Sequence, residues 1–236
     1  MHLAINGWFW AQPATGSGQT VRYLVPALVE QEPGLEITVV VPDWVVPDWV
    51  VPEWAVPEGG GDSQAMDALP ERVSLLPVSC RHGNLGKVWF EQRIFPRVCR
   101  QIGVDLAHVP YFASPLSPTV PTLVTIHDLI PMVLPQYRGG MRVRLYTSLV
   151  ASAASRARLV LTDSQASKQD VLAHLKLSDT PVRVVYLAPA PHYRPVDDPI
   201  ALDEVRKKYN LPETFVLWLS SFDVRKNAQA LLHAYT

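Results

Sequence analysis

Short apolar runs alternate with longer segments of helical periodicity along most of this 236-residue chain. Seven runs are predicted to be strands: Leu3–Asn6, Ile37–Val41, Val73–Pro77, Leu106–Val109, Leu123–Ile126, Leu159–Thr162 and Val182–Leu187. Helical periodicity is found in Thr20–Glu30, Lys87–Gly103 and Met141–Arg158, and we expect Pro26 and Pro96 to kink or shorten the first two helices. This alternation predicts βαβ units and therefore an α/β fold with a mainly parallel sheet.

The composition indicates a globular protein with a substantial core, since 48% of the residues are hydrophobic. Lys plus Arg number 21 and Asp plus Glu number 22, so no global field attracts the chain to nucleic acid. The N-terminus reads as a strand and not as a signal peptide, and no apolar run approaches the roughly 20 residues of a membrane span. Cys80 and Cys99 are too few for a disulfide framework, which favours two core thiols in a reducing cytosol.

A change of character begins at Pro189, where the chain becomes rich in proline and loses periodicity as far as Pro199. We therefore expect a domain at 1–188, a linker at 189–199 and the first elements of a second domain at 200–236. Those elements are a helix at Ile200–Tyr209, a strand at Phe215–Ser220 and a helix at Ala228–Tyr235. A single βα unit cannot bury its own apolar face, so we expect a fragment of a longer protein, or a unit packed against something outside this sequence.

Residues 41–58 form an internal repeat of period five that begins Val41-Pro42-Asp43-Trp44-Val45. Proline in every unit excludes a helix or a sheet interior, which predicts an extended or turn-rich loop. The tryptophans are suited to a sugar face or to a membrane interface, and an insertion without a role is an equally open interpretation.

Polar residues follow three predicted strands at their carboxyl ends, where open α/β sheets place their chemistry. These are His127-Asp128, Thr162-Asp163-Ser164, and Ser220-Ser221 ahead of Arg225-Lys226, and together they suggest one cleft. Asp128 can instead cap the following turn and His127 can be a satisfied buried imidazole, but their position at a strand end favours function. Further on, Ser167-Lys168-Gln169-Asp170 predicts a capping box that opens a helix at Lys168–Leu175.

A glycine-containing loop at Gly16-Ser17-Gly18 follows the first strand and precedes a helix, so its backbone amides can face a phosphate. Val21 stands where a dinucleotide fingerprint requires glycine, and no Lys-Ser/Thr pair follows as in a P-loop. The pattern therefore argues against NAD binding and against ATP hydrolysis.

The pair Arg225-Lys226 precedes the last helix, where positive charge is unfavourable unless an anion is bound. A solvated surface pair, or a bridge from Arg225 to Asp223, is the competing interpretation. Glu91 falls inside a predicted helix and either orients a substrate hydroxyl or is an exposed helix carboxylate. Histidines are scattered without ligand spacing, so no metal site is predicted.

Four motifs in order resemble the family-4 retaining glycosyltransferases, above all the bacterial mannosyltransferase-type members that build polysaccharides. They are the first strand with its glycine loop, Thr125 to Pro131, Thr162 to Ser167, and Val224-Arg225-Lys226-Asn227, and they span nearly the whole chain. The resemblance implies a GT-B architecture, in which two Rossmann-like domains, each a mostly parallel sheet with helices on both faces, face each other across a cleft. The second of these would be truncated here.

The resemblance also implies roles for particular residues. Gly16, Ser17 and Gly18 would approach the diphosphate of a nucleotide-sugar donor such as GDP-mannose or a UDP-sugar, and Arg225 with Lys226 would neutralise it as it leaves, without a metal ion. His127 with Asp128 would act at the donor sugar. Glu91, Tyr111 and Ser164 are candidates for positioning the acceptor, a glycan or lipid-linked glycan, or the sugar. No nucleic-acid partner is implied.

Departures from the family pattern limit the expected activity. Ser220 stands where related members commonly have glycine, an additional arginine close after it is missing, and the family's acidic pair would lie beyond Thr236. This chain alone should therefore not be a competent enzyme. A nucleotide-sugar epimerase and a noncatalytic binding or assembly domain remain as alternatives.

The expected location is the cytoplasm, with contact at the inner face of the membrane as a further possibility. Five arginines flank or lie on one predicted helix and could meet anionic lipid, although an ordinary solvated helix face is the alternative: Arg138, Arg142, Arg144, Arg156 and Arg158.

Overall fold

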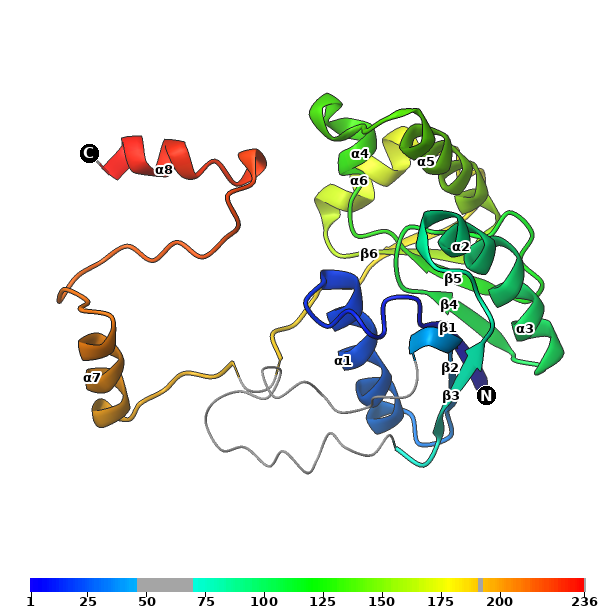
Figure 1. Ribbon diagram of the computed structural model, residues 1–236, viewed down its shortest axis with the longest axis horizontal. Helices are drawn as coiled ribbons and strands as arrows, with labels where there is room; N and C mark the ends of the chain where they lie inside the picture. Colours follow the sequence, from blue (N-terminus) through cyan, green and yellow to red (C-terminus); the bar gives the residue numbers. More distant parts are fainter. Residues whose placement is uncertain (46–69, 191–192, 236) are drawn as a thin grey trace. The chain divides into compact units, whose positions relative to one another are not determined.

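The computed structural model describes residues 1–45, 70–190 and 193–235 (Figure 1). It divides into two compact units, Met1–Ala188 and Pro189–Thr236, and each is described by itself.

The first unit is built on a seven-stranded sheet in the order β3-β2-β1-β4-β5-β6-β7 (Figure 1). The strands are β1 His2–Asn6, β2 Glu36–Pro42, β3 Val73–Val78, β4 Leu106–Val109, β5 Thr122–Thr125, β6 Leu159–Thr162 and β7 Val182–Val184. Every neighbouring pair is parallel, which confirms the predicted α/β fold. The order reverses between β1 and β4, and ligands of open sheets bind beyond the carboxyl ends of strands at such a switch point.

Two strands end earlier than their apolar runs predict. β5 stops at Thr125, although the Ile126 N–H still donates to the Leu161 carbonyl at 2.8 Å. β7 stops at Val184 instead of Leu187. On the opposite edge, β3 accommodates Pro77 because an edge strand does not need every N–H for pairing.

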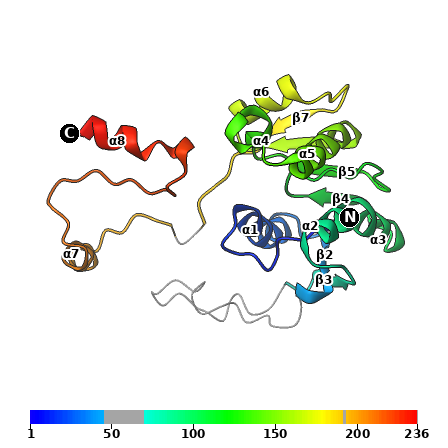
Figure 2. The same ribbon diagram turned by 45° about the horizontal axis from the view of Figure 1, so that its top comes forward.

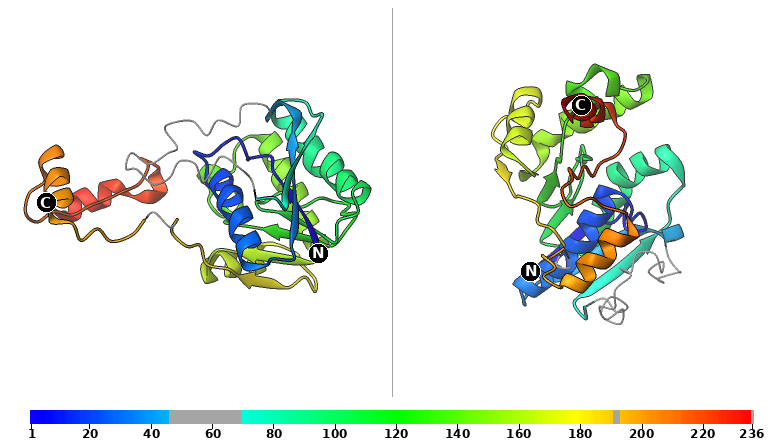
Figure 3. Two further views of the ribbon diagram at one scale, coloured as in Figure 1. Left: turned by 90° about the horizontal axis from the view of Figure 1, so that it is seen from below. Right: turned by 90° about the vertical axis from the view of Figure 1, so that its left-hand side faces the viewer.

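Helices cover both faces of the sheet, as predicted (Figure 3). The helices of this unit are α1 Gly16–Gln31, α2 Gly83–Trp89, the π-helical segment Phe90–Ile94, α3 Phe95–Gln101, α4 Ile130–Val133, α5 Met141–Ala153 and α6 Gln165–His174. Alternate residues of β1 face different cores: Ala4 packs in the cluster that includes Phe90 and Phe95, and Ile5 packs in the cluster that includes Val21 and Val25 of α1. Helices α4, α5 and α6 gather over the β5–β7 half of the sheet (Figure 2).

Neither proline shortens its helix. α1 continues through Pro26 to Gln31. Pro96 lies in the first turn of α3, directly after the π-helical segment, in which the Phe95 N–H donates to the Phe90 carbonyl. The wider turn brings the chain into register for a residue that has no N–H to donate, so the chain stays helical from Gly83 to Gln101.

The predicted capping box at Ser167 is wrong. α6 begins at Gln165, and its cap is Ser164, whose Oγ accepts from the Ser167 N–H at 3.0 Å. Ser164 has the extended backbone of a cap, whereas Ser167 already lies in the first turn. The helix therefore starts one turn closer to the end of β6 than the sequence pattern indicates.

The second unit contains two helices, α7 Pro199–Lys208 and α8 Ala228–Tyr235, and a 3-10 turn at Val224–Lys226. Asp198 caps α7 and Pro199 fills its first position, a common helix start. The predicted strand at Phe215–Ser220 is wrong, because that segment is irregular and pairs with no strand in the described part of the chain. A lone extended segment has no ladder to stabilise it.

Most of the five-residue repeat lies outside the described residues. Of its first unit, Val41 and Pro42 end β2 and Asp43–Val45 form a 3-10 turn. Trp44 packs edge-on against Trp8, with ring centroids 5.4 Å apart. No helix in the described ranges is both long and apolar enough to span a bilayer.

Candidate functional site

Parallel strands place the residues that follow β5 and β6 at the same edge of the sheet, and a hydrogen bond between His127 and Asp163 joins them. The Nδ1 of His127 lies 2.7 Å from the Oδ2 of Asp163, and the two side chains are 24% and 20% exposed. The other ring nitrogen, Nε2, lies 3.1 Å from the Pro110 carbonyl oxygen after β4. His127 is therefore held from both sides at the carboxyl ends of three strands.

Both ring nitrogens of His127 face acceptor atoms. A carboxylate and a carbonyl oxygen are both acceptors, so each ring nitrogen must carry a hydrogen for both contacts to be hydrogen bonds. A doubly protonated ring donates from both nitrogens and has no free lone pair, so in that form His127 would serve as a cationic hydrogen-bond donor and not as a general base.

Three neighbouring residues shape this edge. The Ser167 hydroxyl donates to the His127 carbonyl at 2.8 Å, and Ser164 caps α6. The exposed Asp128 accepts from the Ile130 N–H at 3.0 Å and so caps the turn into α4. Of the predicted site residues, the structure thus links His127 to Ser164 through the Ser167 hydroxyl and gives Asp128 a local capping contact.

A second histidine, His108, is more deeply buried than His127. His108 of β4 is buried, and its Nε2 lies 2.8 Å from the Thr125 hydroxyl. Burial, with a further contribution from the charge of His127, lowers the pKa of His108 to about 4. His108 therefore stays neutral and ties β4 to β5.

Glu91 and Tyr111, predicted to position acceptor or sugar, meet in a buried network beside the switch point. Glu91 is only 1% exposed, which excludes the alternative of an exposed helix carboxylate. Its carboxylate pairs with Lys87 and accepts from the Tyr146 hydroxyl at 2.9 Å. The Tyr111 hydroxyl donates at 2.9 Å to the Oδ1 of Asn6, the last residue of β1. Burial raises the pKa of the Glu91 carboxyl, while Lys87 and the tyrosine hydroxyls act in the opposite direction.

The glycine loop divides into a structural part and an open part. The Gly18 N–H donates to the Thr15 hydroxyl at 3.1 Å, and a Cβ at Gly18 would lie 2.0 Å from the Gln12 carbonyl oxygen. Gly16 is exposed, with nothing within 4 Å of a Cβ built on it. The amides of Gly16 and Ser17 begin α1 and have no acceptor within the helix, so they are the ones suited to an anion.

Arg225 and Lys226 belong to the second unit. The Arg225 Nε lies 3.3 Å from Asp223 Oδ1, which also accepts from the Arg225 N–H, so the bridge named as the competing interpretation is present. Asn227 adopts a left-handed conformation, with φ of 50°, and leads into α8. A cleft that these cations share with His127 stays a prediction.

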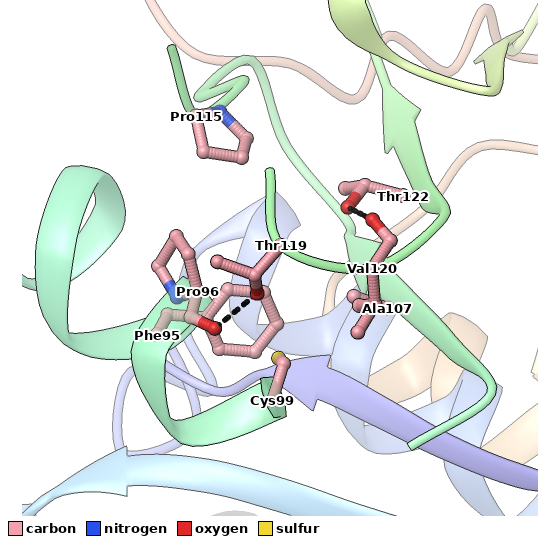
Figure 4. A pocket seen from close by; sticks show the side chains of 8 residues that line it. All are labelled: Phe95, Pro96, Cys99, Ala107, Pro115, Thr119, Val120 and Thr122. Carbon is pink, nitrogen blue, oxygen red and sulfur yellow. Dashed lines mark hydrogen bonds between the residues drawn. The ribbon is translucent and has the colours of Figure 1, made fainter. Parts of the chain in front are cut away.

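A small pocket lies toward the amino end of β5 and contains none of the predicted site residues (Figure 4). It is lined by Phe95, Pro96, Cys99, Ala107, Pro115, Thr119, Val120 and Thr122. The hydroxyls of Thr119 and Thr122 donate to the carbonyls of Pro96 and Val120 (Figure 4). Burial raises the pKa of the Cys99 thiol to about 12, which makes it unreactive. This pocket offers no chemistry.

Within residues 1–45, 70–190 and 193–235, no group of three or more His, Cys, Asp or Glu side chains could hold a metal ion.

Sequence reasoning missed three residues of these clusters as site candidates, namely Asn6, Lys87 and Tyr146, and gave no individual role to Asp163. Asp163 had a signal, because it lies in the polar run after β6. Lys87 stands four residues before Glu91, the spacing of a helical ion pair. Nothing local indicated Asn6 or Tyr146, whose contacts lie far away along the chain.

The family model described as Glycosyltransferase Family 4 matches residues 14–188, which include the His127–Asp163 pair, the glycine loop and all of the buried network except Asn6. The chain belongs to this family. The match confirms the resemblance drawn from the motifs at the strand ends.

Among curated relatives, the family 4 chain is 28% identical over 117 residues to the serotype-specific mannosyltransferase WbdA of Escherichia coli, and the match covers 49% of this chain and 14% of WbdA. It is 27% identical over 114 residues to O-antigen chain mannosyltransferase B of E. coli, covering 48% of this chain and 30% of that protein. Each match thus spans under a third of the relative. Among solved structures, a UGT transferase from Siraitia grosvenorii in complex with UDP aligns with a TM-score of 0.49 and 11% identity, over 89% of this chain and 55% of that one.

Proposed function

We propose that this protein transfers a sugar from a nucleotide-sugar donor to a glycan or lipid-linked acceptor with retention of configuration. The observation that carries the proposal is the family match over 14–188, which contains the His127–Asp163 pair at the carboxyl edge of the sheet. The two E. coli relatives are named as mannosyltransferases, so mannose, carried by GDP, is the first sugar to test, with UDP-sugars beside it.

Charge stabilisation explains which groups would handle the donor. Breaking the bond to a nucleoside diphosphate develops negative charge on the leaving oxygens and positive charge at the anomeric carbon. In the proposed mechanism the amides of Gly16 and Ser17, with the rigid turn at Gly18, face the diphosphate. Arg225 and Lys226 neutralise it in place of a metal ion.

His127 would serve the donor sugar. As an imidazolium held by Asp163, it can turn its Nε2–H from the Pro110 carbonyl to a sugar hydroxyl without changing protonation. A same-face reaction needs no nucleophile from the protein, because the leaving phosphate accepts the proton of the acceptor hydroxyl. A histidine without a free lone pair suits that chemistry. Asp128 lies beside it with an exposed carboxylate.

The acceptor would bind on the first unit, near Glu91, Tyr111 and Ser164. We further propose that the second unit is the first part of a donor-binding domain and that its remaining elements, outside this sequence, cover Leu219 and Phe222, which are each 93% exposed. The chain alone would then be inactive. We also propose that the protein lies in the cytoplasm at the inner face of the membrane. Its point of contact would be a surface on α2 and α5 formed by Leu85, Trp89, Met141, Arg142, Arg144 and Leu145.

The test compares residues 1–236 with the native full-length polypeptide in transfer assays with labelled GDP-mannose and a panel of UDP-sugars. We expect transfer by the full-length protein only.

In the full-length protein, His127→Ala should lower kcat about 100-fold, the loss that follows removal of one transition-state hydrogen-bond donor. The matched control His174→Ala, an exposed histidine at the end of α6, should have no effect. Robust turnover by residues 1–236 would contradict the need for a second domain, and sugar conversion without an acceptor would indicate an epimerase.

A further inference from the structure

The side chain of Lys87 on α2 ends inside a group of three aromatic rings. Its Nζ lies 4.8 Å from the ring centroid of Tyr111, 5.0 Å from that of Tyr146 and 5.5 Å from that of Phe9. The rings come from the loop after β4, from α5 and from the loop after β1. We call these four residues the lysine cage. Aromatic cages attract cations, and here the cation belongs to the protein itself.

One of the three N–H groups of the Lys87 ammonium is available to a ligand. Of its three N–H groups, one is directed to the Glu91 carboxylate and one to the Tyr146 hydroxyl at 2.9 Å. No acceptor for the third occurs in the described part of the chain. The Lys87 side chain is 20% exposed while that of Glu91 is 0% exposed, so the remaining donor lies on the open side of the pair.

The cage is held in place by a continuous network. The π-helical segment supplies Glu91, α5 supplies Tyr146, and Tyr111 links to Asn6 at the end of β1. The Oδ1 of Asn6 is fixed by the Trp8 N–H at 3.1 Å, and its buried Nδ2 has no partner among the described residues. Buried ion pairs and unpaired amides contribute little to stability, and π-helical turns are frequent at functional sites. The network is better explained by a role in binding.

Charge decides which class of ligand fits. The Glu91 carboxylate compensates the Lys87 ammonium, so the cage offers an anion little net attraction. Aromatic rings suit the C–H faces of a sugar, and a single well-oriented N–H suits a hydroxyl. A neutral, hydroxyl-rich ligand therefore matches the cage better than a phosphate does.

We propose that Lys87, held by Glu91 and Tyr146, positions a hydroxyl group of a neutral glycan acceptor beside the switch point of the sheet. This inference rests on the proposed function and deepens it, since it assigns acceptor recognition to the glycan and not to a lipid phosphate. Lys87 is a positioning residue in this role.

The test is binding of mannobiose to the full chain, measured by saturation-transfer NMR without any donor. Lys87→Met keeps the apolar stem and removes the donor, and we expect at least tenfold weaker binding. Because this variant leaves Glu91 unpaired and can fail to fold, the double variant Lys87→Met/Glu91→Met replaces the buried pair with two apolar side chains and should fold and not bind. The control is Lys207→Met, which breaks the exposed Asp203–Lys207 pair of the same four-residue separation on α7.

Three results would overturn the inference: no binding of mannobiose by the wild type, equal binding by the folded double variant, or displacement of mannobiose by inorganic phosphate. Binding without transfer by the full-length protein would instead contradict only the proposed function. In transfer assays, the double variant should raise the acceptor KM at least tenfold and leave the donor KM unchanged. If Lys87 had only a structural role, the acceptor KM and the donor KM would change together.

Discussion

His108 and His127 lie close together near the carboxyl edge of the sheet, yet their surroundings differ. Both ring nitrogens of His127 face acceptors, a carboxylate and a carbonyl oxygen. His108 is buried against a hydroxyl, and both burial and the neighbouring charge keep it neutral. Residue type alone therefore says little about function here. The partners of each ring nitrogen determine what each histidine can do.

The neutral state of His108 predicts an acid-sensitive fold. Its pKa falls from 6.5 to about 4 on folding, so between these values the unfolded chain binds more protons and stability decreases as the pH is lowered. The full effect is about 3 kcal/mol of the free energy of unfolding. We expect urea titrations from pH 7 to pH 4 to show this loss in the wild type and a smaller loss in His108→Gln. The control His174→Gln should behave as the wild type does, and an identical loss in His108→Gln would refute the assignment.

At the scale of the elements, the first turn of α1 contains two glycines that are required for different reasons. Gly18 is needed because the chain at Gln12 approaches its Cα too closely for any side chain. Gly16, two residues earlier, has open space above it and lies where an anion would bind. The first of these is a packing requirement, and the second is a functional candidate.

Gly18→Ala should destabilise the protein by about 2–3 kcal/mol, because its Cβ would overlap a backbone carbonyl that cannot move aside easily. Gly16→Ala should leave stability unchanged. Urea denaturation of both variants measures the difference. Equal unfolding midpoints for Gly16→Ala and Gly18→Ala would contradict a close contact between Gly18 and the Gln12 carbonyl.

The start of α6 gives a second prediction at this scale. Ser164→Ala removes the oxygen that accepts the Ser167 N–H and should cost about 1 kcal/mol. Ser148→Ala, at an exposed position of α5, is the matched control and should cost nothing. Unfolding monitored by circular dichroism measures both variants. If Ser164→Ala is as stable as the control, Ser164 is not the cap.

At the scale of the molecule, two segments far apart in sequence form a surface without exposed acids. Glu91, which is buried, is the only acidic residue within 72–104, and 129–162 contains none. The Lys87–Tyr146 hydrogen bond joins α2 to α5. Exposed apolar side chains stand on both helices: Leu85 87%, Trp89 60%, Met141 78% and Leu145 65%. Together with Arg142 and Arg144 they suit a membrane with anionic lipid.

We therefore expect the chain to pellet with vesicles of phosphatidylglycerol and phosphatidylethanolamine, and to be released as salt screens the arginines. The double variant Leu85→Ser/Trp89→Ser should bind roughly tenfold more weakly, since it removes two large apolar anchors. Tyr23→Ser, on α1 and therefore on the other face of the sheet, is the control. Equal pelleting of the double variant and the control would exclude this surface as the contact.

Much of the fold could be predicted from the sequence, because strand and helix periodicities are local. Each apolar segment also had to bury its own side chains. Once parallel pairing was predicted, the polar residues after β5 and β6 had to share an edge. Several local predictions still failed, among them the two that follow. The cap of α6 depended on the backbone conformation at Ser164, and the segment Phe215–Ser220 depended on a pairing strand that the described chain does not provide.

The amino-acid sequence by itself determined the α/β architecture, the family and the edge of the sheet where polar groups gather. Only the tertiary structure decided which groups meet there. His127 and Asp163 are 36 residues apart, Lys87 and Tyr146 are 59 apart, and Asn6 and Tyr111 are 105 apart. Such contacts follow from the order of strands and the packing of helices, which no local pattern encodes. For the same reason, the two partners of the His127 ring and the burial of Glu91 became evident only in the tertiary structure.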